Sequence, residues 1–440
     1  MTEGKISKSI ALFALPIMGG LILQMLYNTV DGIVVGNFVG ENALGAVNTS
    51  GAFVNLLVSI SNGLAGGSSV YLAQLFGARE KERLHRAMST MLLMMIGIGV
   101  ILTVTGELIA DIVLRNMLNV PEQVYGWAMS YLRIYLLGLI CVFLYNAMAS
   151  ALRSVGDSKA AMYMLIISSV ANIVLDLIFV VLFGWGVIGV AVATVLAQLI
   201  AVLLCLVYVK KKQPLLFVQW NEISFNKSDC SIYLKTGIPL AIQYIISNTG
   251  ALAVQRLVNS YGESFMASVA AASKIEIYAV IPIMCFAQTM TVFSGQNIGA
   301  NQPERVRKGL HASWAMSLTG CLVLTMVFLF GSKPLIMLFG CRGEVLEIGV
   351  QYLHFVPVSL FFAAFMYTTK CALQGAGDIK VPLVFTFVTL FLRVVAAYAM
   401  AATPIGYRAV WIATAVDFGA GAILNLIRFR GGKWKYMKTF

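Results

Sequence analysis

Polar and ionisable side chains recur at helical spacing inside long apolar stretches of this sequence. Gln24, Asn28 and Asp31 stand at i, i+4 and i+7, so a helix would carry them on one face. Asn172 and Asp176 stand four residues apart in a later apolar stretch, and they would again share a face. An ionisable side chain costs free energy in such surroundings, so we take these positions as candidate functional residues.

Further polar side chains in the first half of the sequence could line the same cavity. They are Tyr27, Asn55, Ser59, Asn62, Thr194 and Gln198. We expect them to converge with the two aspartates on one polar cavity. Two carboxylates repel each other in a medium of low dielectric constant, so at least one should hold a proton near neutral pH.

This pair of carboxyl groups suits two kinds of ion. It would carry a proton, or it would bind Na⁺ together with nearby amide and hydroxyl oxygens, because hard cations prefer oxygen ligands. The alternative for each aspartate is a hydrogen bond to a neighbouring helix without a role in function.

Charged residues also interrupt the apolar stretches of the second half. Arg393 and Asp417 fall at similar depth in neighbouring stretches, and we predict a structural ion pair. Lys274 and Glu276 are two residues apart, so they would not face each other on a helix. We expect them to have other partners, with a role in shaping a cavity as the alternative.

The composition indicates which elements must position these residues. Of the 440 residues, 59% are hydrophobic and 11% are charged, whereas soluble proteins carry about 25% charged residues. This excludes a soluble globular enzyme and a disordered chain, and it indicates a polytopic membrane protein. The net charge of +12 is spread over short clusters between apolar stretches, which does not favour nucleic-acid binding.

Twelve stretches have the length of about 20 apolar residues that a helix needs to cross a membrane. They are 10–35, 46–76, 87–112, 127–152, 160–184, 188–209, 237–258, 266–297, 310–332, 350–373, 381–402 and 408–428. We therefore predict an all-α polytopic membrane protein with 12 transmembrane helices. We read the first stretch as a retained helix, not a signal peptide.

The distribution of lysine and arginine predicts the orientation of these helices. With a cytoplasmic N-terminus, most of the 31 Lys and Arg residues fall in cytoplasmic segments. Those left in outer loops are Arg115, Lys333, Arg342 and Arg408. Because cytoplasmic segments carry the excess of positive charge, we expect both termini in the cytoplasm.

The two halves of the sequence are internal repeats. Residues 39–78 align without gaps on 261–300. A polar stretch separates the halves, so we predict an N-lobe at 1–212, a cytoplasmic linker at 213–236 and a C-lobe at 237–440. Each lobe would be a six-helix bundle. Since six is even, the pseudo-twofold axis must run along the membrane normal, as in many transporters.

The repeat shows that the acidic cluster belongs to one half. Asp176 aligns with Ala397, and Asn172 aligns with Arg393. Duplication of a purely structural helix would not remove the cluster selectively. We infer that the N-lobe is the half that senses the ion.

The sequence contains no catalytic motif, no phosphate-binding loop and no clustered Cys and His residues. We therefore expect a transporter that is not an enzyme and needs no cofactor or resident metal. A membrane-embedded enzyme or a receptor-like binding protein is the alternative from another class.

The chain resembles the multidrug and toxic compound extrusion (MATE) family over nearly its whole length. The matching residues are Leu15-Pro16, Gln24, Asp31, Gly36, Gly40, Ala46-Val47, Ala73-Gln74, Gly77-Ala78 and the run from Gly295 to Ala300. Within the family it looks like the DinF-like bacterial branch. Vibrio-type exporters carry a Glu on the seventh helix, whereas this chain has Ser247 near that place.

The resemblance implies an ion-coupling site in the N-lobe. The family branch uses an Asp on the first helix, an Asn and an Asp on the fifth, a Thr on the sixth and a Tyr on the fourth. The matching residues here are Asp31, Asn172, Asp176, Thr194 and Tyr131.

The expected function is antiport of H⁺ or Na⁺ against organic, mostly cationic amphipathic compounds, by rocking between outward-open and inward-open states. We expect a monomer in the bacterial inner membrane, surrounded by lipid. The alternative is a flippase or exporter of lipid-linked saccharides or another small molecule from the same superfamily. Such flippases usually have more spans and cationic cavities, which this sequence does not favour.

Overall fold

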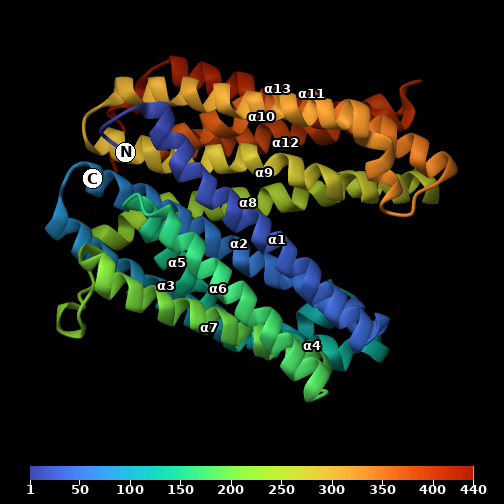
Figure 1. The fold of residues 1–440 in the computed structure, drawn as a ribbon, viewed down its shortest axis with the longest axis horizontal. Helices are drawn as coiled ribbons and strands as arrows, with labels where there is room; N and C mark the ends of the chain where they lie inside the picture. Colours follow the sequence, from blue (N-terminus) through green and yellow to red (C-terminus); the bar gives the residue numbers. More distant parts are fainter. Residues whose placement is uncertain (440) are drawn as a thin grey trace. The chain divides into compact units, whose positions relative to one another are not determined.

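The computed structural model describes residues 1–439, except for the side chains of residues 220, 249 and 251. It is all-helical over that range, without a strand (Figure 1). The long helices are α1 (Ile6–Phe38), α2 (Glu41–Gly77), α3 (Lys81–Ile112), α4 (Glu122–Leu137), α5 (Leu139–Ser154), α6 (Ser158–Asp176), α7 (Gly186–Lys212), α8 (Lys227–Ser260), α9 (Glu263–Gly299), α10 (Pro303–Met337), α11 (Gly343–Gly375), α12 (Lys380–Ala401) and α13 (Ala409–Arg430).

These helices confirm the predicted class of an all-α polytopic membrane protein. In the described part of the chain, 11 helices are long and apolar enough to cross a membrane, and counting the bent pair α4 and α5 as one span gives up to 12. Ten of the 12 predicted stretches lie within one of these spans, whereas 160–184 and 381–402 end two residues and one residue past theirs. Most of the helices are longer than the stretches, as expected for helices that continue past the apolar core of a membrane into the polar interface.

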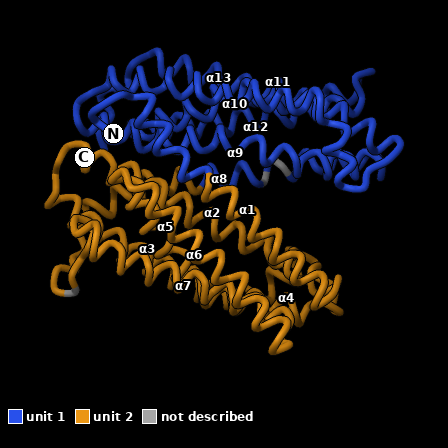
Figure 2. Tube along the Cα trace, viewed as in Figure 1, with its two compact units in different colours: residues 1–18, 242–440 blue, residues 19–241 orange. Residues whose placement is uncertain are grey.

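The contacts divide the chain into two compact units: residues 19–241, and residues 1–18 together with 242–440 (Figure 2). In the first unit α6 packs against α7, and α5 packs against α2, α3 and α7. In the second unit α11 packs against α9, α10 and α13. The division falls inside α1 and α8, whereas the repeat predicts lobes that meet at the linker 213–236. The lobe limits stay a prediction.

Helices α1 and α8 each pass from one unit to the other. The beginning of each of these two helices is fixed by packing inside the unit that contains it. Ile10 of α1 is fully buried in an apolar cluster that contains Phe293 and Leu310. At the start of α8, the buried Asp229 accepts a hydrogen bond from the Tyr71 hydroxyl at 2.7 Å and pairs with the Arg86 guanidinium at 3.2 Å. Such side-chain contacts between distant segments leave no periodic pattern in the sequence.

Small residues bring α2 and α8 into backbone contact within the unit 19–241. A Cβ atom added at Gly63 would lie 2.2 Å from the Cα of Ala241. A Cβ atom added at Gly67 would lie 2.4 Å from the Cα of Gly237. Membrane helices associate closely where small residues recur every four positions, and these two glycines have that spacing.

Two irregularities lie near the predicted site. Helices α4 and α5 meet at Gly138 with a bend of 48°. Directly after Asp176, helix α6 changes into a π-helical segment, Leu177–Leu182. Single π-helical turns occur often at functional sites because they rotate the side chains on either side of the extra residue.

Candidate functional site

Three helices of the unit 19–241 carry four of the N-lobe residues predicted from the sequence. Asp31 lies on α1, Asn172 and Asp176 lie on α6, and Thr194 lies on α7. Helix α1 approaches α6 closely at Gly20, where an added Cβ atom would be 3.2 Å from Leu165. This packing brings the acidic faces of α1 and α6 together.

The centre of the site is a group of buried polar atoms without partners. Asp176 is fully buried, and neither of its carboxyl oxygens accepts a hydrogen bond from a donor in the described part of the chain. Asn172 is 3% exposed, and both atoms of its amide likewise lack a partner there. Oδ1 of Asp31 is in the same condition. Buried polar groups are nearly always hydrogen-bonded, so such a cluster indicates a place for an ion, water or substrate.

The two aspartates face each other. Their carboxyl groups lie close enough to interact electrostatically, and two carboxyl groups in a buried place repel each other unless one of them carries a proton. Tyr131 of α4 lies near both carboxyl groups, and it is 8% exposed. The site can therefore exchange a proton, or a cation in its place, against one negative charge.

Tyr135 is a member of this site that sequence reasoning missed. It is 8% exposed and its ring stacks on Tyr131 with 6.2 Å between the ring centroids. It also lies near Tyr27 of α1. The four-residue spacing of Tyr131 and Tyr135 is the signal that could have found it.

The other predicted cavity residues are placed less uniformly. The Thr194 hydroxyl donates to the Val190 carbonyl at 2.9 Å, which leaves its oxygen lone pairs free to bind a cation. Oε1 of Gln198 is buried without a partner among residues 1–439. Gln24 lies near the Tyr27 side chain.

The predicted polar residues of α2 make no hydrogen bond to Asp31 or Asp176 in the described part of the chain. Ser59 donates to the Asn55 carbonyl at 2.7 Å. Asn55, Asn62 and Asn28 have exposed side chains, and no hydrogen bond in the described part of the chain joins them to the aspartates. Their role as cavity-lining residues stays a prediction.

The charged residues of the second half lie in the other unit. The Arg393 Nη1 and Asp417 Oδ2 atoms are 3.9 Å apart. Glu276 accepts a hydrogen bond from the Tyr352 hydroxyl at 2.5 Å. The Lys274 ammonium lies 5.9 Å from the centroid of the Phe339 ring. Lys274 and Glu276 thus have separate surroundings.

If the Arg393–Asp417 pair is structural, its two charges depend on each other. We expect Arg393→Met and Asp417→Leu each to lower the free energy of unfolding by about 3 kcal/mol, because each leaves one charge in a largely buried place. The double variant should recover most of the loss, since it removes both charges. Thermal unfolding in detergent measures the three variants, and equal, additive losses would contradict a structural pair.

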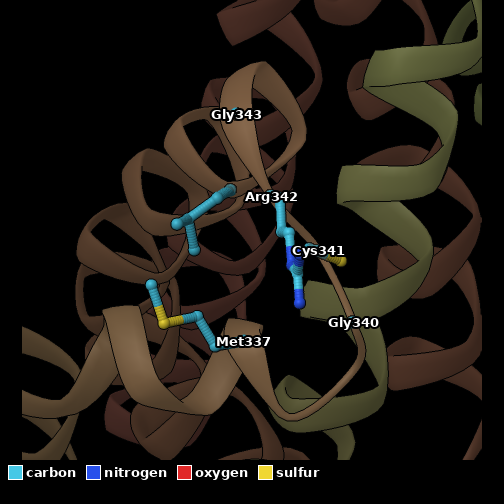
Figure 3. A pocket seen from close by; sticks show the side chains of 6 residues that line it. Met337, Gly340, Cys341, Arg342 and Gly343 are labelled. Atoms are coloured by element: carbon cyan, nitrogen blue, oxygen red, sulfur yellow. The ribbon is translucent and has the colours of Figure 1, made fainter.

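A cavity of about 410 Å³ lies at the turn between α10 and α11 (Figure 3). It is lined by Met337, Gly340, Cys341, Arg342, Gly343 and Leu346. Arg342 supplies the charged group among these lining residues. It belongs to a different compact unit from the aspartate pair, and we assign it no part in the chemistry above.

The chain is similar to known proteins over almost its whole length. A sequence model of the MatE family matches residues 16–178 and 239–399, which is more than half of the chain. The chain is 28% identical to the probable multidrug resistance protein YpnP of Bacillus subtilis, over 100% of this chain and 98% of that protein. It is 25% identical to the probable multidrug resistance protein NorM of Thermotoga maritima, over 98% and 94%.

Two solved structures share the fold over almost the whole chain. One is the outward-facing conformation of a multidrug resistance MATE family transporter, with 26% identity, a TM-score of 0.91 and coverage of 98% of this chain and 97% of that chain. The other, with the same values, is a MOP superfamily transporter from Pyrococcus furiosus whose reversed binding-pocket polarity is described as suggesting a different function.

Proposed function

The chain belongs to the MATE family of transporters, and we propose that it is a multidrug exporter driven by a cation gradient through Asp31 and Asp176. The observation that carries this proposal is the pair of facing carboxyl groups with buried, unpartnered oxygens. A secondary transporter needs such a site, where occupation by an ion changes the charge inside the protein. The named multidrug relatives support drug-like compounds as the substrates.

The N-lobe, with limits proposed at 1–212, would be the coupling half. Ala397 stands where the repeat requires a second Asp176, so the C-lobe at 237–440 lacks the same carboxyl group. Ser247 in place of a glutamate supports the DinF-like branch over the Vibrio-type branch. The lysine and arginine bias supports cytoplasmic termini in a bacterial inner membrane. We take a monomer as the working unit, because one chain contains both carboxyl groups.

We infer the following cycle from the charges. An empty, ionised site attracts an organic cation to the protein. Arrival of H⁺ or Na⁺ from outside neutralises the site, weakens the hold on the drug and favours its release outside. Loss of the ion to the cytoplasm restores the negative charge. The organic cation and the coupling ion thus compete for one charge, which is sufficient for antiport.

Both H⁺ and Na⁺ fit the residues that are present. Oxygens of Asp31, Asp176, Asn172 and Thr194 would hold Na⁺, since all four groups supply the oxygen ligands that a hard cation takes. A proton needs only the two carboxyl groups, because it forms one short bond between them.

The test uses purified protein in liposomes with either a proton or a sodium gradient, and it follows a fluorescent organic cation. If protons drive export, the Asn172→Ala variant should lose less than about threefold in flux, because no proton-binding group is removed. If Na⁺ drives export, the same variant should lose about tenfold or more in flux, because a ligand of the ion is removed.

The outcome with neither ion is also informative. Absence of flux with both gradients, in protein that unfolds cooperatively and is monodisperse, would overturn drug export. Lipid-linked saccharides would then be assayed as the cargo.

A further inference from the structure

A second cavity lies at the end of the unit 1–18 and 242–440 where α10 begins and α13 ends. It has a volume of about 260 Å³. Its walls come from α10, α13 and the short 3₁₀ helix η6 (Lys433–Tyr436) that follows α13. The lining residues are Arg307, His311, Trp314, Leu426, Phe429, Arg430, Trp434 and Lys435.

The cavity carries more positive charge than its surroundings neutralise. Lys435 pairs with Glu304 at 3.1 Å. Arg307 and Arg430 are exposed and make no ion pair and no hydrogen bond in the described part of the chain, although Glu304 also lies within electrostatic range of Arg307. Two guanidinium groups therefore line one cavity without a bound acid, and guanidinium is the side-chain group that matches phosphate oxygens best.

A buried donor without an acceptor distinguishes this cavity from an ordinary basic surface. Nε1 of Trp314 is buried and lacks a partner among residues 1–439. Its ring is held by His311, at 5.2 Å between centroids, and by Phe365 at 5.3 Å. Trp434, by contrast, donates to the Phe429 carbonyl at 2.7 Å. A ligand with an acceptor oxygen would satisfy the indole N–H of Trp314.

The cavity also adjoins an apolar exposed surface. Ile423 and Ile427 of α13 are 59% and 63% exposed, and they are four residues apart, hence on one face of the helix. Ile427 precedes Arg430 by one turn. A ligand that places an anion beside Arg430 can therefore extend an apolar chain along α13.

We propose that this cavity binds the phosphate group of an anionic phospholipid. The shared chemistry is a phosphate oxygen facing Arg307, Arg430 and the Trp314 indole, with the acyl chain along Ile427 and Ile423. Basic pockets at the ends of transmembrane helices bind lipid headgroups in this way, and each nearby Lys or Arg strengthens the interaction. Free inorganic phosphate has the same headgroup chemistry but cannot use the apolar face.

The test measures lipid retention by the intact, purified protein, with no transport reaction. Native mass spectrometry compares phosphatidylglycerol with phosphatidylcholine added at equal amounts. We expect a preference for phosphatidylglycerol of about tenfold or more. The double variant Arg307→Gln and Arg430→Gln should lose it. Lys308→Gln with Lys433→Gln removes the same charge from neighbouring positions that do not line the cavity, and it should keep the preference.

Three results would overturn the proposal. They are equal retention of the two lipids by the unaltered chain, an equal loss of preference in both double variants, and displacement of the lipid by millimolar inorganic phosphate alone. The last would assign the cavity to free phosphate. Because the assay contains no ion gradient and no drug, its failure is distinct from failure of the proposed export function.

Discussion

Asp176→Asn is expected to abolish gradient-driven export and to leave a folded protein. The amide has the shape of the carboxyl group, but it cannot exchange a proton or supply a negative charge to Na⁺. One elementary charge moved through 100 mV is worth about 2.3 kcal/mol, or roughly a fiftyfold concentration ratio. The dye concentration ratio across the proteoliposome membrane should therefore fall from a gradient-driven excess to equal concentrations on the two sides.

The control is a carboxyl group outside the site. Asp111 is exposed at the C-terminal end of α3, where Arg115 donates to it at 3.0 Å. Asp111→Asn should export the dye at a rate close to that of the unaltered protein. Normal coupled export by a well-folded Asp176→Asn protein would remove Asp176 from the mechanism and leave it as a residue of packing.

Gly67→Ala is expected to lower the free energy of unfolding by about 3 kcal/mol. Its added methyl group would lie 2.4 Å from the Gly237 backbone, and backbone atoms cannot turn aside as a side chain can. The helices α2 and α8 must separate locally, which costs about as much as overpacking a protein core. This loss exceeds the gain of about 1 kcal/mol that alanine brings to a helix.

Gly66→Ala is the matched control, one residue away on the same helix. Its methyl group would meet a Leu240 methyl at 3.7 Å, an ordinary contact. We expect equal or slightly raised stability, because only the helix propensity changes. Thermal unfolding in detergent compares the two variants, and equal melting temperatures would show that α2 and α8 are not in backbone contact.

The sequence by itself determined the class of the protein and the asymmetry of its halves. Long apolar stretches force helices to cross the membrane, because an unpaired backbone group in lipid costs several kcal/mol. The repeat and the missing carboxyl group at Ala397 could be read without coordinates. Asp31 and Asp176 stood out because charge is rare and costly within such stretches.

Only the tertiary structure decided which of these residues meet. Periodicity gives the face of a helix, but not the rotation of one helix against the next. The facing of Asp31 with Asp176, the place of Tyr135 and the division inside α1 thus came from packing. The cavity at Arg307 and Arg430 also depends on tertiary packing. Its residues are over a hundred positions apart, and they form the cavity only when α10, α13 and η6 are folded together.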